Sequence, residues 1–472
     1  MLRFFKDFFI YGFASIIGKL AAVFLMPIYT NILTQEEYGA MALITSIKGI
    51  IDLFANLNIH SGIAREYRED GIDRTKLVST GFYSILGISL TVMSVMICTQ
   101  LFWQETVLSL DRRYSVAFLI MLMTIPAGST LSYFSILTRF KRKPVLYSIG
   151  TIIQILIQIG VSVIGVVVLR YGISSLFAGI LCGEIFGILY FSYINRSNIA
   201  LTFKKEYLKK ALLFSIPTLP AILAGWIDSS MGQVIIGKYI STTDLGVYSI
   251  ALQLASVFSF ISIALNNVWG PYLYENYKKE GFVNEVKKLY TTIVLGLTVI
   301  AVATSLLSKE IILLLSNSSY IKATEYFTLL CIPMCIYLLF PMATSGISIS
   351  SDTKYIGISY VAGSVMNIVF MILLIQHIGI IAVPISLGIS RITAYSILYY
   401  ISKKKGVIVL PNGILITLIS SIILCYIINT TNIDFLYRLL ITTCIDIVLI
   451  TFLLKSVTLN NLLKFVKKRK SK

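Results

Sequence analysis

Seven charged residues lie near the middle of long apolar runs, where a charge is costly unless it has a structural or functional role. They are Lys19, Lys48, Asp52, Glu184, Asp228, Arg391 and Asp446. An ionised side chain at membrane depth costs about 2.5–3.5 kcal/mol on insertion scales, so such residues either pair with one another or serve a transport path. We expect Asp446 to serve packing, and the other six are candidates for a site.

Lys48 and Asp52 are four residues apart, which places them on one face of a helix within reach of each other. They form either an internal salt bridge that fixes helix packing or part of a cleft wall, on which Lys48 meets an anion and Asp52 holds it or binds a coupling cation. Lys19 has no acidic partner within its own apolar run, and an unpaired cation at membrane depth indicates an anionic substrate. Lys19 and Lys48 are therefore the predicted anion-binding residues.

Amide side chains extend this polar set. Asn56 follows Asp52 along the same run, and Asn266 and Asn267 lie in a later one. Amides at membrane depth either join helices by hydrogen bonds or, in a cleft, bind sugars. Together with Asp52 and Asp228, they are the predicted polar lining of a cleft or the groups of an ion-coupling site.

The elements that must position these residues are membrane-spanning helices. Hydrophobic residues make up 57% of the 472 residues and charged residues 13%, and the apolar runs recur at lengths of about 20 residues, which suffices to cross a bilayer as a helix. The predicted fold is an all-α polytopic membrane protein. Its fourteen transmembrane helices are expected at 8–33, 38–64, 77–103, 115–138, 144–169, 173–194, 210–237, 245–270, 289–308, 323–346, 355–376, 379–402, 410–429 and 434–455.

The net charge of +18 is explained by its distribution and needs no nucleic-acid partner. With a cytoplasmic amino terminus, 30 of the 40 Lys and Arg residues fall in predicted cytoplasmic segments and 7 in outer ones, loop after loop, as the positive-inside rule requires. We therefore expect a multi-pass protein with both termini cytoplasmic and with its basic segments beside anionic lipids. The first apolar run is too long for a signal-peptide core, so we expect no cleavage there.

An internal repeat runs through the sequence at an offset of 207 residues. "TQEEYG" (34–39) falls on "STTDLG" (241–246), which sets Gly39 on Gly246, and "LMTIP" (122–126) falls on "LLCIP" (329–333), which sets Pro126 on Pro333. Matches at Gly and Pro carry weight because these residues mark turns and kinks. We expect the repeated turn itself to bind nothing.

This offset predicts two parallel six-helix lobes with a cleft between them. The amino-terminal lobe, 1–200, holds spans 1–6, and the carboxy-terminal lobe, 201–407, holds spans 7–12. An extra helix pair and a basic cytoplasmic tail follow at 408–472. Duplicated lobes around a midplane cleft suit alternating access, in which one lobe rocks against the other, so the predicted function class is a transporter.

The same offset sets Glu184 on Arg391, two residues of opposite charge. Pseudo-symmetry would place them across the axis from one another, as a pair or gate between the lobes. In the alternative, each satisfies polar groups inside its own lobe. The sequence leaves both interpretations open.

Motifs for bond-making chemistry do not occur in the sequence. It has no Gly-rich phosphate loop that ends in Lys-Ser/Thr and no GxSxG, and its predicted outer loops are too short for a catalytic module. We expect no enzyme, no cofactor and no metal site, since only two His residues accompany six Cys residues that all lie within spans. The energy source is expected to be an H⁺ or Na⁺ gradient, the substrate's own gradient or another protein.

Five stretches carry a family resemblance. They are "IYGFASIIGKLAAVFLMPIYTNILTQEEYGAMALITSI", "NIHSGIAREY", "FSIPTLPAILAGWI", "VIIGKYISTTDLGVYSIA" and "NNVWGPYLYE". They resemble the Wzx-type oligosaccharide flippases of the polysaccharide biosynthesis protein family, in the multidrug/oligosaccharidyl-lipid/polysaccharide exporter superfamily. Members often have an acidic–basic pair just before "IIGKY", whereas this sequence has Gly232 and Gln233 there.

The resemblance implies a MATE-like flippase fold. Its substrate would be an undecaprenyl-diphosphate-linked oligosaccharide, turned from the inner to the outer leaflet of a bacterial plasma membrane for surface polysaccharides such as capsule or O-antigen. The diphosphate would then be the anion that Lys19 and Lys48 attract. A polysaccharide polymerase and chain-length proteins would be further partners.

Three alternatives remain. An ion-coupled drug antiporter of the same superfamily would end near twelve spans, with acidic residues dominating the cleft. A lipid II flippase for peptidoglycan precursors has fourteen spans, but would call for more Arg in the early spans. A polysaccharide polymerase or membrane glycosyltransferase would need a sizeable outer loop or interfacial catalytic carboxylates.

Overall fold

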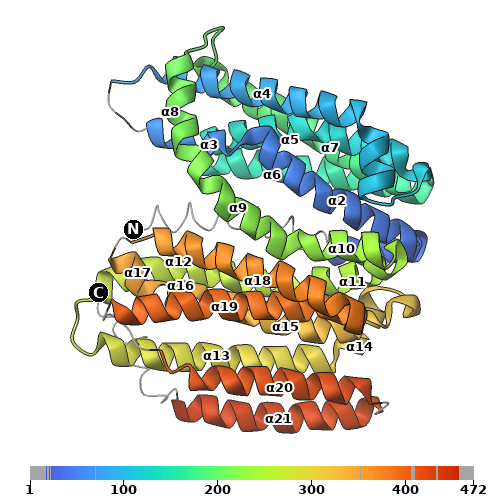
Figure 1. Cartoon of the computed structure of the whole chain (residues 1–472), viewed down its shortest axis with the longest axis vertical. Helices are drawn as coiled ribbons and strands as arrows, with labels where there is room; N and C mark the ends of the chain where they lie inside the picture. Colours follow the sequence, from blue (N-terminus) through green and yellow to red (C-terminus); the bar gives the residue numbers. More distant parts are fainter. Residues whose placement is uncertain are drawn as a thin grey trace. The chain divides into compact units, whose positions relative to one another are not determined.

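The computed structural model describes residues 18, 21, 23–67, 69, 71–141, 143–350, 352–405, 410–431 and 434–456, without the side chains at 263, 264, 267 and 452–456. The elements of these ranges are helices, which fall into two compact units, residues 1–249 and 250–472 (Figure 1). Each unit is a helical bundle with a buried apolar cluster of its own.

Eleven of the described helical segments are long and apolar enough to cross a membrane. One of them, Lys354–Lys404, contains two successive helices. This confirms the predicted class, an all-α polytopic membrane protein. The count of fourteen spans stays a prediction.

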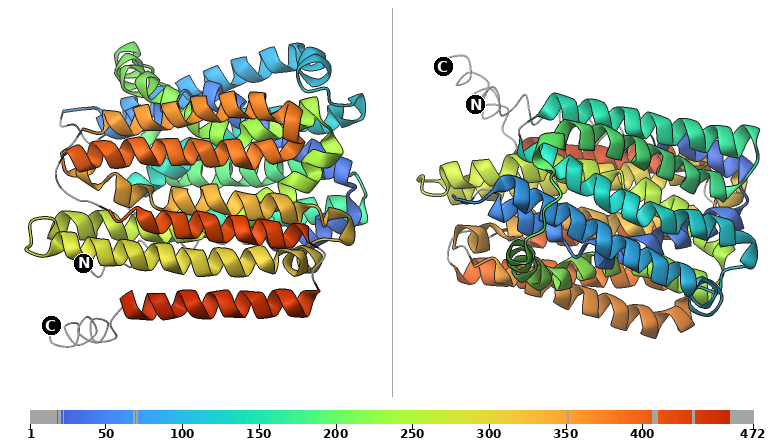
Figure 2. Two further views of the ribbon diagram at one scale, coloured as in Figure 1. Left: turned by 60° about the horizontal axis from the view of Figure 1, so that its bottom comes forward. Right: turned by 90° about the horizontal axis from the view of Figure 1, so that it is seen from above.

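In its described residues, the first unit has nine α-helices that follow one another along the chain. They are α2 (Gln35–Asn56), α3 (Ile59–Glu66), α4 (Arg74–Cys98), α5 (Ser115–Phe140), α6 (Pro144–Val163), α7 (Ile173–Asn195), α8 (Lys205–Ser215), α9 (Leu219–Trp226) and α10 (Gly232–Tyr239). Within it, α7 packs against both α5 and α6, while α2 contacts α4, α5 and α10 (Figure 2). The next helix, α11 (Thr242–Ala255), crosses the boundary between the units.

Individual residues explain where these helices begin and how closely neighbouring helices pack against each other. The Thr34 side chain accepts a hydrogen bond from the backbone N–H of Glu37, whose carboxylate reaches back to Thr34, a capping box that starts α2. Pro144 occupies the first position of α6, where its missing N–H costs nothing. Gly179 lets α7 approach α6, because a Cβ there would lie 2.6 Å from the carbonyl oxygen of Gln158.

The predicted span 38–64 is interrupted rather than continuous. Leu57 and Asn58 have left-handed backbone angles, φ 45° and 54°, which end α2 and begin α3. The break is held by α8 and the turn after it, since Asn58 Nδ2 donates to Thr218 Oγ1 at 2.8 Å and Ser215 Oγ donates to the Asn58 carbonyl at 2.9 Å. The polar residues Asn56, His60 and Ser61 around the break were a local signal for it, but the apolar residues farther out made the predicted span continuous.

Ten helices follow α11 in the described part of the second unit. They are α12 (Phe258–Asn276), α13 (Phe282–Leu306), α14 (Ser308–Leu315), α15 (Ala323–Leu338), α16 (Phe340–Ala343), α17 (Ser345–Ile349), α18 (Lys354–Ile378), α19 (Ala382–Lys404), α20 (Gly413–Thr430) and α21 (Phe435–Ser456). Helices α18 and α19 form a hairpin, and α15 packs on α19. Helices α20 and α21 lie beside α13 (Figures 1 and 2).

Polar anchors attach the last two helices to α13 and its neighbours. The buried Arg438 of α21 pairs with Glu310 of α14, N to O 2.6 Å, and also donates to the Leu306 carbonyl. Asn429 of α20 donates to the carbonyl of Ser305 and to Thr328 Oγ1. The pair predicted at 408–472 is thus part of the second compact unit in its described residues. The predicted limits of the two lobes and the extra helix pair, 1–200, 201–407 and 408–472, stay a prediction. The two compact units of the structure divide after Ser249.

Candidate functional site

A polar cavity of about 300 Å³ lies inside the first unit, between helices that are otherwise apolar. Helix α2 contributes Lys48, Asp52 and Asn56 to its wall, α5 contributes Gly128 and several hydroxyl side chains, and α7 contributes Glu184. The structure therefore brings together four of the residues predicted from the sequence, Lys48, Asp52, Asn56 and Glu184.

Lys48 and Asp52 form the predicted pair along α2. Lys48 Nζ donates to Asp52 Oδ2 at 2.7 Å, and the two side chains are 15% and 31% exposed. The second carboxylate oxygen of Asp52 is buried without a hydrogen-bond partner among the described residues. The ammonium group that was predicted to meet an anion is thus engaged by Asp52 in this conformation.

Glu184 adds a second carboxylate to the cavity, from a helix far along the chain. Its side chain is buried, at 8% exposure, and its Oε2 atom accepts no hydrogen bond within the described part of the chain. A Cβ placed on Gly128 would lie 2.9 Å from Glu184 Oε1 and 3.5 Å from Lys48 Nζ, so both groups face the same glycine of α5. Two carboxylates around one ammonium form a site that can take up one more positive charge, such as a proton.

Helix α2 also makes polar contacts with α9 and α10. Trp226 Nε1 donates to the Ser46 carbonyl at 2.9 Å, and Ser46 Oγ hydrogen-bonds Gln233 Oε1. Gln233, which stands just before "IIGKY", thus takes part in a neutral hydroxyl–amide contact with α2. Asp228 is buried in the π-helical turn Ile227–Met231 and does not line the cavity.

The remaining predicted residues lie elsewhere. Lys19 lies outside the described residues, as does the side chain of Asn267. Asn266 donates to the Ser262 carbonyl one turn earlier in α12. Arg391 of α19 rests on aromatic rings of the second unit, 4.4 Å from the Tyr337 centroid and 5.9 Å from that of Phe340. Glu184 and Arg391 thus each have contacts inside their own unit, and a gate between the lobes stays a prediction.

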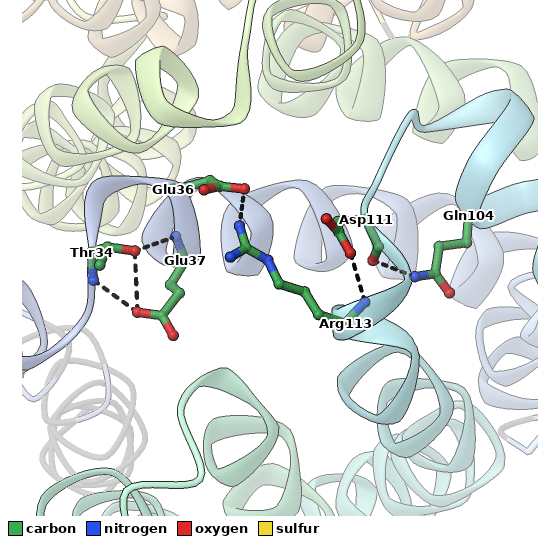
Figure 3. A network of polar contacts seen from close by, with 6 residues as sticks. All are labelled: Thr34, Glu36, Glu37, Gln104, Asp111 and Arg113. Atoms are coloured by element: carbon green, nitrogen blue, oxygen red, sulfur yellow. Dashed lines mark hydrogen bonds and ion pairs between the residues drawn. The ribbon is translucent and has the colours of Figure 1, made fainter.

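A second polar network joins α2 to the segment before α5 (Figure 3). Glu36 pairs with Arg113, Asp111 accepts a hydrogen bond from the Arg113 backbone at 2.8 Å, and the Asp111 carbonyl accepts one from Gln104 at 2.6 Å. Nearby, the Arg112 guanidinium holds the pKa of Glu105 below its ordinary value. Sequence reasoning missed this network, because Glu36 and Arg113 are 77 residues apart.

Sequence reasoning also missed the place of Glu184 in the cavity with Lys48. A signal existed in the small residues Gly128 and Ser129, which interrupt a long apolar run and allow a polar side chain to approach. The signal is weak alone, since it does not say which helix packs there.

Known proteins resemble this chain in sequence. A family model described as "Polysaccharide biosynthesis protein" matches residues 28–325. The succinoglycan biosynthesis transport protein ExoT of Rhizobium meliloti is 22% identical over 49% of this chain, and the match spans 46% of that relative, about half its length. Lsg locus putative protein 1 of Haemophilus influenzae is 21% identical over 85% of this chain and 99% of that protein.

Solved structures resemble its fold. The lipid II flippase MurJ, in an inward closed conformation, matches with a TM-score of 0.72 at 16% identity, over 96% of this chain and 99% of that one. An inward-facing multidrug resistance MATE family transporter matches with a TM-score of 0.65 at 14% identity, over 86% and 99%.

Proposed function

This chain belongs to the polysaccharide biosynthesis protein family, and from that premise we propose that it flips an undecaprenyl-diphosphate-linked oligosaccharide across a bacterial plasma membrane. Its family and fold are those of membrane flippases and transporters. The substrate moves from the inner to the outer leaflet by alternating access, for assembly of a surface polysaccharide.

One observation carries the proposal: a polysaccharide-biosynthesis family model covers residues 28–325 of a chain folded as flippases are. The extent of the fold match favours a lipid-linked substrate over a drug. The MurJ match covers 96% of the chain and so includes most of α20 and α21, whereas the MATE match covers 86%. A lipid II-type precursor is the second candidate, favoured by the same match.

The cavity of the first unit suits the coupling step. Lys48, Asp52 and Glu184 form a half-buried cluster with one carboxylate in excess, inside a bundle where unpaired charge is costly. Uptake and release of one H⁺ or Na⁺ there would change the charge balance between α2 and α7 and so bias the two states of the transport cycle. Ion coupling therefore belongs to the proposed mechanism.

The test is reconstitution of the full chain in vesicles with a fluorescent undecaprenyl-diphosphate-linked oligosaccharide. Translocation is measured with and without an imposed H⁺ or Na⁺ gradient, beside parallel arms with lipid II and with a cationic drug. We expect the oligosaccharide alone to move, and faster with one of the gradients. Transport of the drug but not of the oligosaccharide would overturn the assignment, and transport of lipid II alone would establish the second candidate.

The variant Glu184→Gln keeps the shape of the side chain but removes its charge. We expect it to translocate at a rate that no longer responds to the gradient, whereas Asp73→Asn, in the exposed cap of α4, stays as the wild type. Lys19→Ala and Lys48→Ala test the predicted contacts with the diphosphate. Unchanged translocation in both would remove these two residues from substrate binding.

The proposal includes the predicted placement of the protein. Both termini would face the cytoplasm of a bacterium, beside anionic lipids. A polysaccharide polymerase and chain-length proteins would act on the flipped product.

A further inference from the structure

Four arginines at one end of the first unit each lie over an aromatic ring. The pairs, with the distance from the guanidinium carbon to the ring centroid, are Arg65–Phe214 at 5.0 Å, Arg74–Tyr67 at 5.3 Å, Arg139–Tyr147 at 5.3 Å and Arg196–Tyr193 at 4.3 Å. All four arginines are exposed. They belong to segments that the charge distribution predicts to be cytoplasmic.

Other cations of the molecule, Lys238, Lys278, Lys354 and Arg391, also lie over aromatic rings, but these four arginines are grouped at one end of the first unit. Among the described residues, none of the four forms an ion pair with a carboxylate. By contrast, Arg112, Arg113 and Arg438 are each paired with a glutamate. Neighbouring lysines are also engaged, since Lys76 pairs with Asp73 and Lys141 donates to Asn198. This end of the unit therefore keeps its guanidinium groups available.

An aromatic ring beneath a guanidinium group prepares it for an anion. The ring contacts the face of the planar group and fixes its orientation, while the N–H donors point outward from its edge. Those donors match two oxygens of a phosphate at once, which the point charge of a lysine does not. Topology alone would not require this, because positive-inside orientation counts Lys and Arg alike.

Two of the four arginines are related through one ring contact and a step along the chain. The Tyr67 ring under Arg74 stacks on Phe140, with centroids 6.3 Å apart, and Phe140 follows Arg139 in the last turn of α5. Arg139 in turn rests on Tyr147, which lines the cavity of Lys48 and Glu184. We call Arg74, Tyr67, Phe140, Arg139 and Tyr147 the arginine strip. It leads from the surface of the unit to the cavity.

We propose that the arginine strip is the loading site for the diphosphate of the lipid-linked substrate, with Arg74 and Arg139 as its anion-binding residues. The inference rests on the proposed function for the identity of the substrate. A diphosphate presents two linked phosphate groups, which suit two guanidinium groups, that of Arg74 over the Tyr67 ring and that of Arg139 over the Tyr147 ring. Lys48 is less suited to this first contact because its charge is engaged by Asp52.

Binding of inorganic pyrophosphate to the purified full chain in detergent tests the site without any lipid substrate. We expect saturable binding, measured by titration calorimetry, that Arg74→Ala and Arg139→Ala each weaken by about tenfold or more, since each loses a charge-assisted contact. Arg139→Lys keeps the positive charge but loses the paired N–H donors of the guanidinium group. We expect its affinity for pyrophosphate to lie between those of Arg139→Ala and the wild type. Arg112→Ala, whose guanidinium pairs with Glu105, should bind as the wild type does.

Several outcomes would overturn the proposal. They are absence of saturable pyrophosphate binding, equal affinity in the wild type and the two strip variants, or an equal loss in Arg112→Ala. Circular dichroism and the melting temperature of Arg139→Lys establish that a weakened variant is folded. A further arm adds phosphatidylglycerol vesicles. If they displace pyrophosphate completely from the wild type but not from the strip variants, the strip is a site for lipid headgroups and the proposal falls.

Failure of this proposal is distinguishable from failure of the proposed function. One possible result is that pyrophosphate binding depends on Arg74 and Arg139 but no oligosaccharide is translocated in vesicles. The arginine strip would then be an anion site, and the flippase assignment would be wrong. Translocation that is unaffected in both strip variants would keep the flippase and remove the strip from its loading step.

Discussion

Gly39 and Gly246, at equivalent positions of the two repeats, lie against the first residue of each other's helix. A Cβ at Gly39 would overlap the carbonyl oxygen of Thr242, where α11 begins, and a Cβ at Gly246 would overlap that of Gln35, where α2 begins. The contact is reciprocal, since Gln35 and Thr242 are themselves 207 residues apart. At the repeated turn, the first turns of α2 and α11 therefore cross so closely that only glycine, which has a hydrogen in place of a side chain, fits at positions 39 and 246.

The variants Gly39→Ala and Gly246→Ala should each destabilise the protein. A methyl group at either position meets backbone rather than a flexible side chain, and overpacking of this kind costs about 1–3 kcal/mol. Gly87→Ala is the matched control, because nothing lies within 4 Å of a Cβ at that helical position. Thermal unfolding in detergent checks this, and a melting temperature of Gly39→Ala equal to that of Gly87→Ala would refute the close crossing.

Lys48 and Asp52 should behave as one unit in a double-mutant cycle. Removing Lys48 leaves the half-buried Asp52 without its partner, which we expect to cost about 1–3 kcal/mol, below the figure for fully buried pairs because both side chains retain some exposure. Removing Asp52 should cost less, because Lys48 still faces Glu184. The double variant Lys48→Met/Asp52→Asn leaves neither charge unpaired and should lose less than the two single variants together. If the losses in the free energy of unfolding of the two single variants add up to that of the double variant, Lys48 and Asp52 have no interaction energy.

Arg438 should hold α21 against α13 and α14. Its guanidinium is 6% exposed and bonded to Glu310, so Arg438→Met leaves that glutamate without its partner at a cost of about 2 kcal/mol, reduced because Glu310 is a third exposed. Lys322→Gln, at an exposed cation just before α15, provides the control. Protease cleavage between α20 and α21 should become faster in Arg438→Met, and an unchanged rate would contradict this anchoring role.

The exposed pair Asp352–Lys405 should give a pH-dependent difference between wild type and Asp352→Asn. The hydrogen bond from Lys405 lowers the pKa of Asp352 below its ordinary 3.8, and the same bond raises the pKa of Lys405 above 10.5. A carboxyl whose pKa is lowered by folding stabilises the fold above its unfolded pKa and loses that contribution as pH falls through the folded pKa. The melting temperature should therefore be higher in the wild type than in the variant at pH 7, and the two should converge as pH falls through the lowered pKa of Asp352. If the two melting temperatures still differ below that pKa, the charge of the Asp352 carboxylate is not the source of the difference.

The predicted topology can be checked with single cysteines in a cysteine-free background. Asn317 precedes α15 and Lys354 follows α17, so one passage through the membrane separates them. Asn317→Cys should react with a membrane-impermeant maleimide added outside intact cells, and Lys354→Cys should react only after permeabilisation. The reverse pattern would invert the assigned orientation.

Helix positions could be predicted because a continuous apolar run between polar turns is a local property. The span predicted at 173–194 is α7, Ile173–Asn195, and the predicted 379–402 is α19, Ala382–Lys404. Helices that continue beyond the apolar run were predicted too short. The span expected to begin at residue 289 begins at Phe282, because the first turns of α13 are amphipathic and carry lysines.

The candidate site was predictable only where it is local. Lys48 and Asp52 follow from a spacing of four on one helix, and their ion pair has the expected geometry. The approach of Glu184 depends on how α7 packs on α5 at Gly128, and the pairing of Glu36 with Arg113 depends on a loop 77 residues away. Such contacts are set by tertiary packing, which periodicity in one segment does not encode.

The interruption at Leu57 and Asn58 has a mechanical consequence for the first unit. An unbroken helix transmits a displacement along its whole length, whereas two consecutive left-handed residues divide it into segments that can tilt separately. Asn58 is hydrogen-bonded to Ser215 at the end of α8 and to Thr218 in the turn after it, and its backbone N–H donates to the Asn56 side chain at the end of α2. The break therefore lets α3 take its direction from its packing on α8, while Lys48 and Asp52 lie on the other side of it, in α2.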